Sequence, residues 1–324
     1  MRELKAAFAA DVREFLQRTP RQLPSRYFYD ELGSALFEAI CRLPWYRITR
    51  VETAMLAMHA RDIVDGLAQP LTLAELGCGS GDKLATFAAA AGSASKIAIS
   101  QIQLIDISEA ALDMARYRLQ AVGFREVVAH HALYEEGLER AGRERRAGGA
   151  MLVLFLGSNI GNFDPPADRQ FLARLRSRLR PGDALLLGSD LVKPERELLL
   201  AYDDPLGVTA AFNFNLLRRI NDELGGTFDL AGYDHRAVWN APAGRVEAFL
   251  VSRARQQVRI ADAGLELTLE AGEAIWTESS HKYEPDQILA DGEAAGFRSA
   301  IQWIDPAARF ALTRFAVPGS LGAG

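Results

Sequence analysis

Between residues 71 and 187, short apolar runs alternate with helical patterns, and this alternation limits the possible folds more than any other feature of the chain. The run at residues 151–156 is apolar at every position, which is typical of a parallel strand buried on both faces. Strands and helices that alternate along a chain build a parallel sheet with helices on both faces. The expected strands are 71–76, a run within 97–107, 127–131, 151–156 and 184–187, with helices at 109–122 and 167–179.

The chain on either side of this segment follows other patterns. Residues 1–66 have apolar side chains at helical spacing. After residue 190 we expect a helical stretch at 195–224, strand-like segments at 232–242, 245–253, 256–270 and 274–277, a helix at 285–295, and strands near 299–304 and 309–317. Because 324 residues exceed one ordinary core, we predict an α/β, Rossmann-like core (67–190 and 284–324) and a second α+β domain (1–66 and 191–283).

The composition is typical of a folded protein, since 49% of the residues are hydrophobic and 24% are charged. These fractions exclude disordered, collagen-like and disulfide-scaffold chains. The net charge of −5 argues against nucleic acid and an anionic membrane as partners, because both reward a basic excess. One basic stretch, residues 140–146, has no aromatic residues for base stacking, so we interpret it as a solvated loop between two elements.

The cysteines and histidines form no metal-binding pattern. Cys41 and Cys78 lie in different segments without metal-ligand spacing, so we expect neither a disulfide framework nor a zinc site. His130, His131 and His281 have no third ligand at useful spacing, and we expect no metal.

We expect neither a targeting signal nor a membrane-spanning segment in this chain. The N-terminus is charged and amphipathic, and no apolar run approaches the ~20 residues of a membrane span. We therefore expect a cytoplasmic protein.

The strand at residues 71–76 runs directly into a glycine loop, Glu75-Leu76-Gly77-Cys78-Gly79-Ser80-Gly81. Glycines let the backbone turn sharply and approach a ligand, while the next helix offers its N-terminus. Alone, such a loop is a weak signal, because binders of nicotinamide, flavin and adenosylmethionine cofactors share it. Its place between a strand and a helix strengthens it.

Two details of the loop favour S-adenosylmethionine. It has the form E-x-G-x-G-x-G, whereas the third glycine of the dinucleotide fingerprint G-x-G-x-x-G comes one residue later. The next strand ends in Asp106, where a carboxylate can accept both ribose hydroxyls, although dinucleotide binders also place an acid there. Ser108 is the better candidate for the N-cap of the following helix. Lys83 could pair with the cofactor's carboxylate or be a solvated helix lysine.

Several segments resemble the histidine-specific N-alpha-methyltransferases of ergothioneine biosynthesis, which trimethylate L-histidine to hercynine. The resemblance runs from about residue 20 to the C-terminus. It is carried by FYDELGSALFEAICRLPWYRITR (28–50), ELGCGSGDK (75–83), LFLGSNIGNF (154–163), LLLGSDLVK (185–193), AYDDPLGVTAAFN (201–213) and WTESSHKY (276–283). It implies a class I methyltransferase core joined to a substrate-binding domain built from the N-terminal segment and the late insertion.

The glycine loop and the resemblance together give the expected site residues. The expected cofactor contacts are Glu75, Gly77, Gly79, Gly81, Lys83, Asp106, Ala132, Leu133 and Gly157. The resemblance implies substrate contacts at Tyr46, Asn162, Tyr202, Glu278 and Ser280. Tyr29 and Tyr46 are the expected catalytic residues, and no general base is assigned.

The substrate residues have the chemistry that a zwitterionic amino acid needs. The Asn162 amide and the Tyr202 hydroxyl are neutral donors for its carboxylate. Glu278 and Ser280 match the one N–H and the one acceptor nitrogen of an imidazole. An imidazole left unmatched in a buried pocket would cost ~1–3 kcal/mol per group, which is enough to reject many other amino acids.

Each of these residues also has a structural interpretation. Tyr29 and Tyr46 could be packing residues near a helix end. Asn162 could be a left-handed turn residue, Tyr202 could end a helix, and Glu278 could be a surface carboxylate. The joint occurrence of the motifs favours the functional interpretation.

Some positions depart from the family pattern. Ala132-Leu133 stand where the family has an acid and a phenylalanine against the adenine, so that contact is lost or replaced by the backbone or Glu135. Asn159 stands where threonine is usual. Ala248 stands where some members have a methionine against the imidazole, which enlarges the pocket.

We therefore predict an S-adenosylmethionine-dependent N-methyltransferase that acts on the α-amino group of L-histidine without a metal. The alternative substrate is another aromatic amino acid, such as tryptophan or a substituted histidine. A NAD-dependent oxidoreductase is the alternative from a different class, although no hydride-transfer residue is identifiable. As partners we expect the small-molecule substrate, neither nucleic acid nor membrane, and a monomeric protein.

Overall fold

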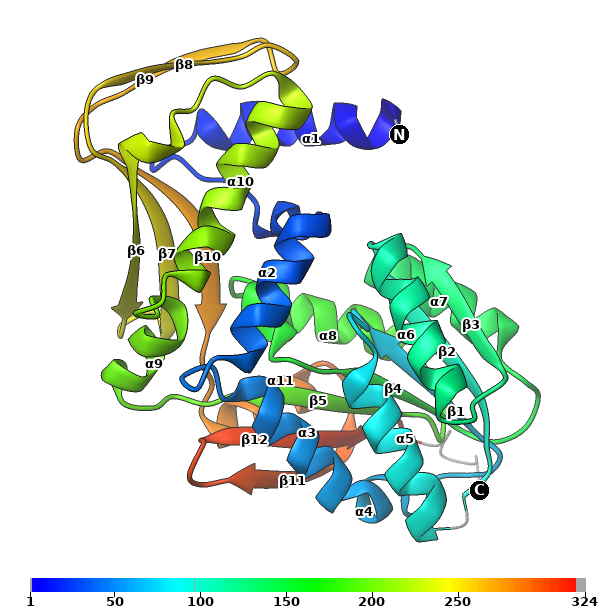
Figure 1. Cartoon of the computed structure of the whole chain (residues 1–324). Coiled ribbons are helices and arrows are strands. Elements are labelled where there is room, and N and C mark those ends of the chain that lie inside the picture. Colours follow the sequence, from blue (N-terminus) through cyan, green and yellow to red (C-terminus); the bar gives the residue numbers. More distant parts are fainter. Residues whose placement is uncertain (1, 96, 319–324) are drawn as a thin grey trace. The chain divides into compact units, whose positions relative to one another are not determined.

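The computed structural model describes residues 2–95 and 97–318, which divide into two compact units (Figure 1). The core unit is Ile48–Val192 with Lys282–Gly324, and the insertion unit is Met1–Arg47 with Lys193–His281. Residues 1, 96 and 319–324, which the predicted domain ranges include, lie outside the described residues.

The N-terminal boundary between the units differs from the sequence prediction. The predicted domains place residues 48–66 with the N-terminal helices. In the structure, α3 (Ile48–Met58) and α4 (Ala60–Val64) belong to the core unit, where both contact α5 (Asp82–Ser95).

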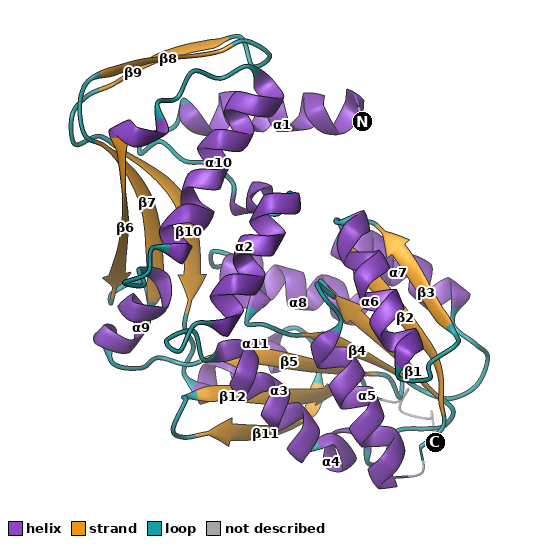
Figure 2. Cartoon of the chain, viewed as in Figure 1, coloured by secondary structure: helices purple, strands orange, loops and turns teal. Residues whose placement is uncertain are grey.

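The core unit is built around a seven-stranded sheet in the order β11-β12-β5-β4-β1-β2-β3 (Figure 2). β1 to β5 pair in parallel, and β12 runs antiparallel to both of its neighbours. Every residue of β4 is buried, as its apolar sequence predicts. The prediction of a doubly wound, mostly parallel sheet is confirmed. The strands are β1 (Leu71–Leu76), β2 (Ile99–Asp106), β3 (Val127–His131), β4 (Met151–Phe155), β5 (Ala184–Asp190), β11 (Arg298–Asp305) and β12 (Phe310–Ala316).

Two rows of helices pack on this sheet. α3, α5 and α6 (Glu109–Ala121) contact one another in turn, and so do α7 (Tyr134–Glu144), α8 (Ala167–Arg178) and α11 (Pro285–Ala294). The second row forms an apolar core with β1, β4 and β5 that includes Phe155, Phe171 and Leu187. The carboxyl ends of the parallel strands lead into loops, which is where open α/β sheets bind ligands.

The interpretation of residues 140–146 as a loop is wrong, because α7 covers most of this stretch. Arg140 pairs with Glu136, and Arg143 pairs with Glu139. Charge pairs four residues apart stabilise a helix, so this basic stretch is mostly a solvated helix.

The insertion unit combines helices with antiparallel strands (Figure 1). Its three-stranded sheet has the order β10-β7-β6, and β8 and β9 form a separate hairpin where a single strand-like segment was predicted. α10 contacts α2, β6 and β7. The strands are β6 (Tyr233–Asn240), β7 (Arg245–Ser252), β8 (Gln256–Ile260), β9 (Leu265–Leu269) and β10 (Ala274–His281); the helical elements are α1 (Arg2–Leu16), η1 (Ser25–Phe28), α2 (Glu31–Arg42), α9 (Glu195–Tyr202), α10 (Val208–Leu224) and η3 (Leu230–Gly232).

Within the described part of the chain, no helix has both the length and the apolar surface that crossing a bilayer requires.

Candidate active site

The glycine loop connects β1 to α5 and has a backbone that glycine adopts readily. Gly77, Gly79 and Gly81 have φ angles of 72°, 49° and 77°, which lie in the left-handed region. A side chain at Gly81 would come within 2.7 Å of Ala115 in α6, so the loop packs closely there. A Cβ at Gly79 would meet no described atom within 4 Å. The loop is therefore held at one point and open at another, as a cofactor-binding loop requires.

Asp106, at the end of β2, is bonded to this loop. Its carboxylate accepts hydrogen bonds from the backbone N–H groups of Gly79, at 3.1 Å, and Ser108, at 2.9 Å. Burial raises the pKa of Asp106, while the bonds from these amides lower it. The N-cap prediction is confirmed, because the Ser108 hydroxyl accepts a hydrogen bond from Ala111 at the start of α6. Ser108, and not Asp106, therefore caps α6, while hydrogen bonds hold the Asp106 carboxylate beside the loop.

Glu75, just before the loop, is buried, and its carboxyl oxygens have no hydrogen-bond partner among the described residues. Burial raises the pKa of Glu75 to about 8; Lys83 lowers it, and Glu52 and Asp106 raise it. Because buried polar groups are normally paired, an unpaired carboxyl at this loop indicates a ligand that carries a donor. The α-ammonium group of S-adenosylmethionine is such a donor, so Glu75 fits this cofactor.

Lys83, in the first turn of α5, is bonded to a buried acid. Its Nζ lies 2.8 Å from Oε2 of Glu52 in α3. The backbone N–H of Gly157, which follows β4, donates to both oxygens of Glu52 at 2.8 Å. The interpretation of Lys83 as a solvated helix lysine is therefore wrong.

Sequence reasoning missed Glu52, although a signal was present. Glu52 shares its buried helix face with Ile48, Met55 and Leu56. A lone acid in an apolar helical stripe is that signal, because carboxylates are almost never fully buried without a partner.

The other expected cofactor residues also lie at carboxyl ends of core strands. The Ala132 amide, after β3, donates to the carbonyl of Asp106 at 3.1 Å. Leu133 is 63% exposed, so its side chain can contact a ligand. Glu135, considered above as a substitute for the missing adenine contact, is paired with Arg174 of α8 at 2.9 Å.

Tyr29, Tyr46, Tyr202 and Glu278 are brought together in the insertion unit from distant parts of the chain. Burial raises the pKa of Tyr46 well above its usual value, and the neighbouring Tyr202, Tyr29 and Glu278 add to that effect. The rings of Tyr29 and Tyr46 both pack against Phe37, at centroid distances of 5.6 and 6.1 Å. The two tyrosines therefore have a packing role as well as a place in this cluster.

Ser280 joins the same cluster. Its hydroxyl shares a hydrogen bond of 2.7 Å with the hydroxyl of Tyr202 at the end of α9. Tyr202 ends a helix, as its structural interpretation predicted. The turn that follows is closed by Asp204, which accepts hydrogen bonds from the backbone amides of Leu206, just before α10, and of Val208 and Thr209 in its first turn. The Tyr202 hydroxyl takes no part in this turn and contacts Ser280 instead.

Ala248 lies opposite Glu278 in the antiparallel pairing of β7 with β10. Glu278 and Ser280 are two residues apart in β10, so their side chains share one face of that strand. Ala248 is buried and contributes only a methyl group beside the acid.

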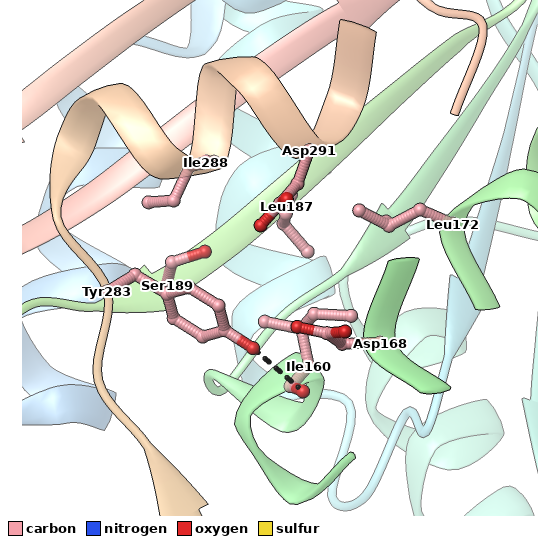
Figure 3. A pocket seen from close by; sticks show the side chains of 8 residues that line it. All are labelled: Ile160, Asp168, Leu172, Leu187, Ser189, Tyr283, Ile288 and Asp291. Atoms are coloured by element: carbon pink, nitrogen blue, oxygen red, sulfur yellow. Dashed lines mark hydrogen bonds between the residues drawn. The ribbon is translucent and has the colours of Figure 1, made fainter. Parts of the chain in front are cut away.

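Asn162 is the one expected substrate residue in the core unit, where it lies in η2 (Asn159–Asn162) after β4. The interpretation of Asn162 as a left-handed residue is wrong, because the positive φ angles of this turn belong to Gly157, at 77°, and Ser158, at 58°. The Tyr283 hydroxyl donates to the carbonyl of Ile160 at 3.2 Å. Figure 3 shows these two residues beside a small cavity that is also lined by Asp168, Leu172, Leu187, Ser189, Ile288 and Asp291. The bond from Tyr283 fixes η2, and with it the backbone at Asn162.

The raised pKa of Glu75 predicts a specific pH dependence of stability. Its pKa is about 8 in the folded protein and about 4.5 when unfolded, so between these values the folded state holds one more proton. The associated stability is complete below pH 4.5 and is lost as the pH rises through 8. We expect wild type to lose on the order of 2 kcal/mol relative to Glu75→Gln between pH 6 and pH 8.

Thermal unfolding of the ligand-free protein at several pH values measures this loss as a Tm difference of several degrees. Glu109→Gln, at an exposed site on α6, should follow wild type at every pH. A Tm difference between wild type and Glu75→Gln that does not change with pH would contradict the prediction.

Comparison with known proteins identifies the family. Residues 8–317 match the family described as histidine-specific, S-adenosylmethionine-dependent methyltransferases. A histidine N-alpha-methyltransferase of Mycolicibacterium smegmatis is 40% identical over 95% of this chain and 94% of its own length, and one of Mycobacterium tuberculosis is 39% identical over 95% and 94%. Ergothioneine biosynthesis protein 1 of Neurospora crassa is 29% identical over 88% of this chain and 32% of its own length.

These matches decide against the NAD-dependent oxidoreductase and agree with the glycine spacing of the loop. Among the described residues, no group of three or more His, Cys, Asp or Glu side chains could hold a metal ion. The chain belongs to the histidine-specific, S-adenosylmethionine-dependent methyltransferases.

Proposed function

We propose that this enzyme methylates the α-amino group of L-histidine, through to the trimethylated betaine hercynine, as a step of ergothioneine biosynthesis. The cluster of Tyr46, Tyr202, Glu278 and Ser280 in the insertion unit carries this proposal. The similarity to histidine N-alpha-methyltransferases along almost the whole chain supports it. Its cytoplasmic location and monomeric state stay predictions.

Glu278 and Ser280 are the residues we assign to the imidazole. The carboxylate accepts the ring N–H, and the hydroxyl donates to the other ring nitrogen. In this arrangement the Ser280 oxygen accepts from Tyr202, because the serine proton is used on the ring. Asn162 is assigned to the carboxylate of histidine, through its side-chain amide.

Bound S-adenosylmethionine supplies a methyl group on a positively charged sulfur. Glu75, Gly77, Lys83 and Asp106 are the residues proposed to hold it. Tyr46 stays protonated at neutral pH because burial raises its pKa, so it does not act as the base. Tyr29 and Tyr46 instead orient the neutral amine, because their hydroxyl oxygens can accept hydrogen bonds from its N–H groups. Alignment of the amine with the methyl group alone contributes much of the rate enhancement.

One observation favours a second substrate class. Ala248 places only a methyl group opposite Glu278, where the side chain of a methionine would occupy more space. A bulkier aromatic amino acid, such as tryptophan or a ring-substituted histidine, is therefore the second candidate. Ser280 speaks against tryptophan, because an indole has an N–H for Glu278 but no acceptor nitrogen for the serine hydroxyl.

A methyl-transfer assay with all common amino acids and S-adenosylmethionine, read by mass spectrometry, tests the proposal. We expect histidine to gain three methyl groups and the other amino acids to gain none. Transfer to tryptophan alone would replace histidine with the second candidate. A single methyl group on histidine would retain the substrate but remove hercynine as the product.

A further inference from the structure

Glu52 is a fully buried carboxylate that is not among the expected site residues. From α3 it binds both the Lys83 ammonium in α5 and the Gly157 amide after β4, each at 2.8 Å. It therefore connects the helix that follows the glycine loop to the loop that follows β4.

The fold leaves space for this ion pair at two glycines. A Cβ at Gly188 in β5 would lie 1.9 Å from Oε1 of Glu52. A Cβ at Gly157 would lie 3.1 Å from Nζ of Lys83. One glycine thus borders the carboxylate, and the other borders the ammonium.

Stability alone is a weak reason for an acid at this position. Desolvation costs a buried carboxylate several kcal/mol, and pairing in the interior often does no more than offset that cost. An apolar residue at position 52 would continue the buried stripe of Ile48, Met55 and Leu56. The ion pair does have a clear geometric effect, because it fixes a lysine side chain that carries about 2 kcal/mol of rotamer entropy.

We propose that Glu52 is a positioning residue for the amino-acid end of S-adenosylmethionine, and that it holds Lys83 and the Gly157 loop where the cofactor's carboxylate binds. The inference rests on the role proposed above for Lys83. An ammonium group has three donors, so it can bind Glu52 and a ligand carboxylate together. A lysine fixed before binding loses less entropy when the ligand arrives.

Two ligands separate positioning from general support of the fold. S-adenosylhomocysteine carries the amino-acid end, whereas 5′-methylthioadenosine lacks it and keeps the ribose and adenine. Glu52→Gln preserves the size of the side chain but leaves one acceptor oxygen for two donors. By calorimetry, we expect Glu52→Gln to lower the affinity for S-adenosylhomocysteine about 10-fold or more and to leave the affinity for 5′-methylthioadenosine unchanged.

Control variants make this result specific. Glu109→Gln, exposed on α6, should change the affinity for neither ligand. Gly188→Ala displaces the Glu52 carboxylate without changing any charge, so it should reproduce the selective loss; it also decides the question if Glu52→Gln does not fold. Equal weakening of both ligands, or of neither, would overturn the proposal.

Lys83→Gln distinguishes a failure of Glu52 from a failure of the premise. If Lys83→Gln selectively lowers the affinity for S-adenosylhomocysteine and Glu52→Gln does not, the proposed role of Glu52 is wrong and that of Lys83 stands. Equal loss of both ligands in Lys83→Gln removes the proposed role of the lysine. If both roles hold, the double variant should lose little more affinity than Lys83→Gln alone, because the two residues act on one contact.

Discussion

Replacing Asp106 with alanine is expected to raise the Kd for S-adenosylmethionine by at least about a hundredfold. We assign the two ribose hydroxyls to this carboxylate, and a hydrogen bond to a charged acceptor contributes about 1.5–3 kcal/mol. The same carboxylate accepts a hydrogen bond of 3.1 Å from the Gly79 amide, so removing the carboxylate also removes a contact that holds the glycine loop. Calorimetric titration measures the Kd directly.

Matched variants test whether the ribose is the target. Asp106→Asn keeps the size of the side chain and one acceptor oxygen, so it should lose less affinity. Asp113→Asn, at an exposed position on α6, should bind as wild type does. Because 5′-methylthioadenosine keeps the ribose, Asp106→Ala should strongly lower the affinity for this ligand, whereas Glu52→Gln should leave that affinity unchanged. A Kd for Asp106→Ala close to the wild-type value would contradict the ribose assignment.

The core sheet could be predicted from the sequence because parallel strands covered on both faces leave continuous apolar runs. β1 and β3 have the expected bounds, although β3 lies at the edge of the sheet and is only partly buried. α7 was missed because its few apolar residues, such as Leu138 and Ala141, stand among many charges. The sequence predicts one segment for the β8–β9 hairpin, because a single glycine, Gly264, and no proline lie in the turn between the two strands.

Most of the residues proposed to hold the cofactor lie in one local segment, so a sequence pattern can point to them. Glu75 to Lys83 form one strand-loop-helix segment, and Asp106 ends the next strand. Glu52 and Gly157 are 105 residues apart, and no local pattern connects them. Tyr202 and Ser280 are 78 residues apart, so only the resemblance to a family pointed to that pair.

Replacing Glu278 with alanine is expected to raise the KM for histidine by about 10- to 100-fold and to leave the KM for S-adenosylmethionine nearly unchanged. The carboxylate belongs to the insertion unit, where it lies near Tyr46 and shares a strand face with Ser280. Its removal leaves the imidazole N–H without the acceptor that we assign to it. The residues proposed to hold the cofactor are in the core unit, so the substitution leaves their own contacts in place.

The neighbouring Ser279 provides the control for this variant. Side chains alternate along a strand, so Ser279 points to the opposite face of β10, and Ser279→Ala should leave both KM values unchanged. Glu278→Gln retains an acceptor oxygen without the charge and should show an intermediate KM for histidine. If Glu278→Ala raises both KM values equally, Glu278 supports the fold and does not recognise the imidazole. Because KM equals a dissociation constant only when chemistry is slow, direct titration of histidine should show the same selective loss.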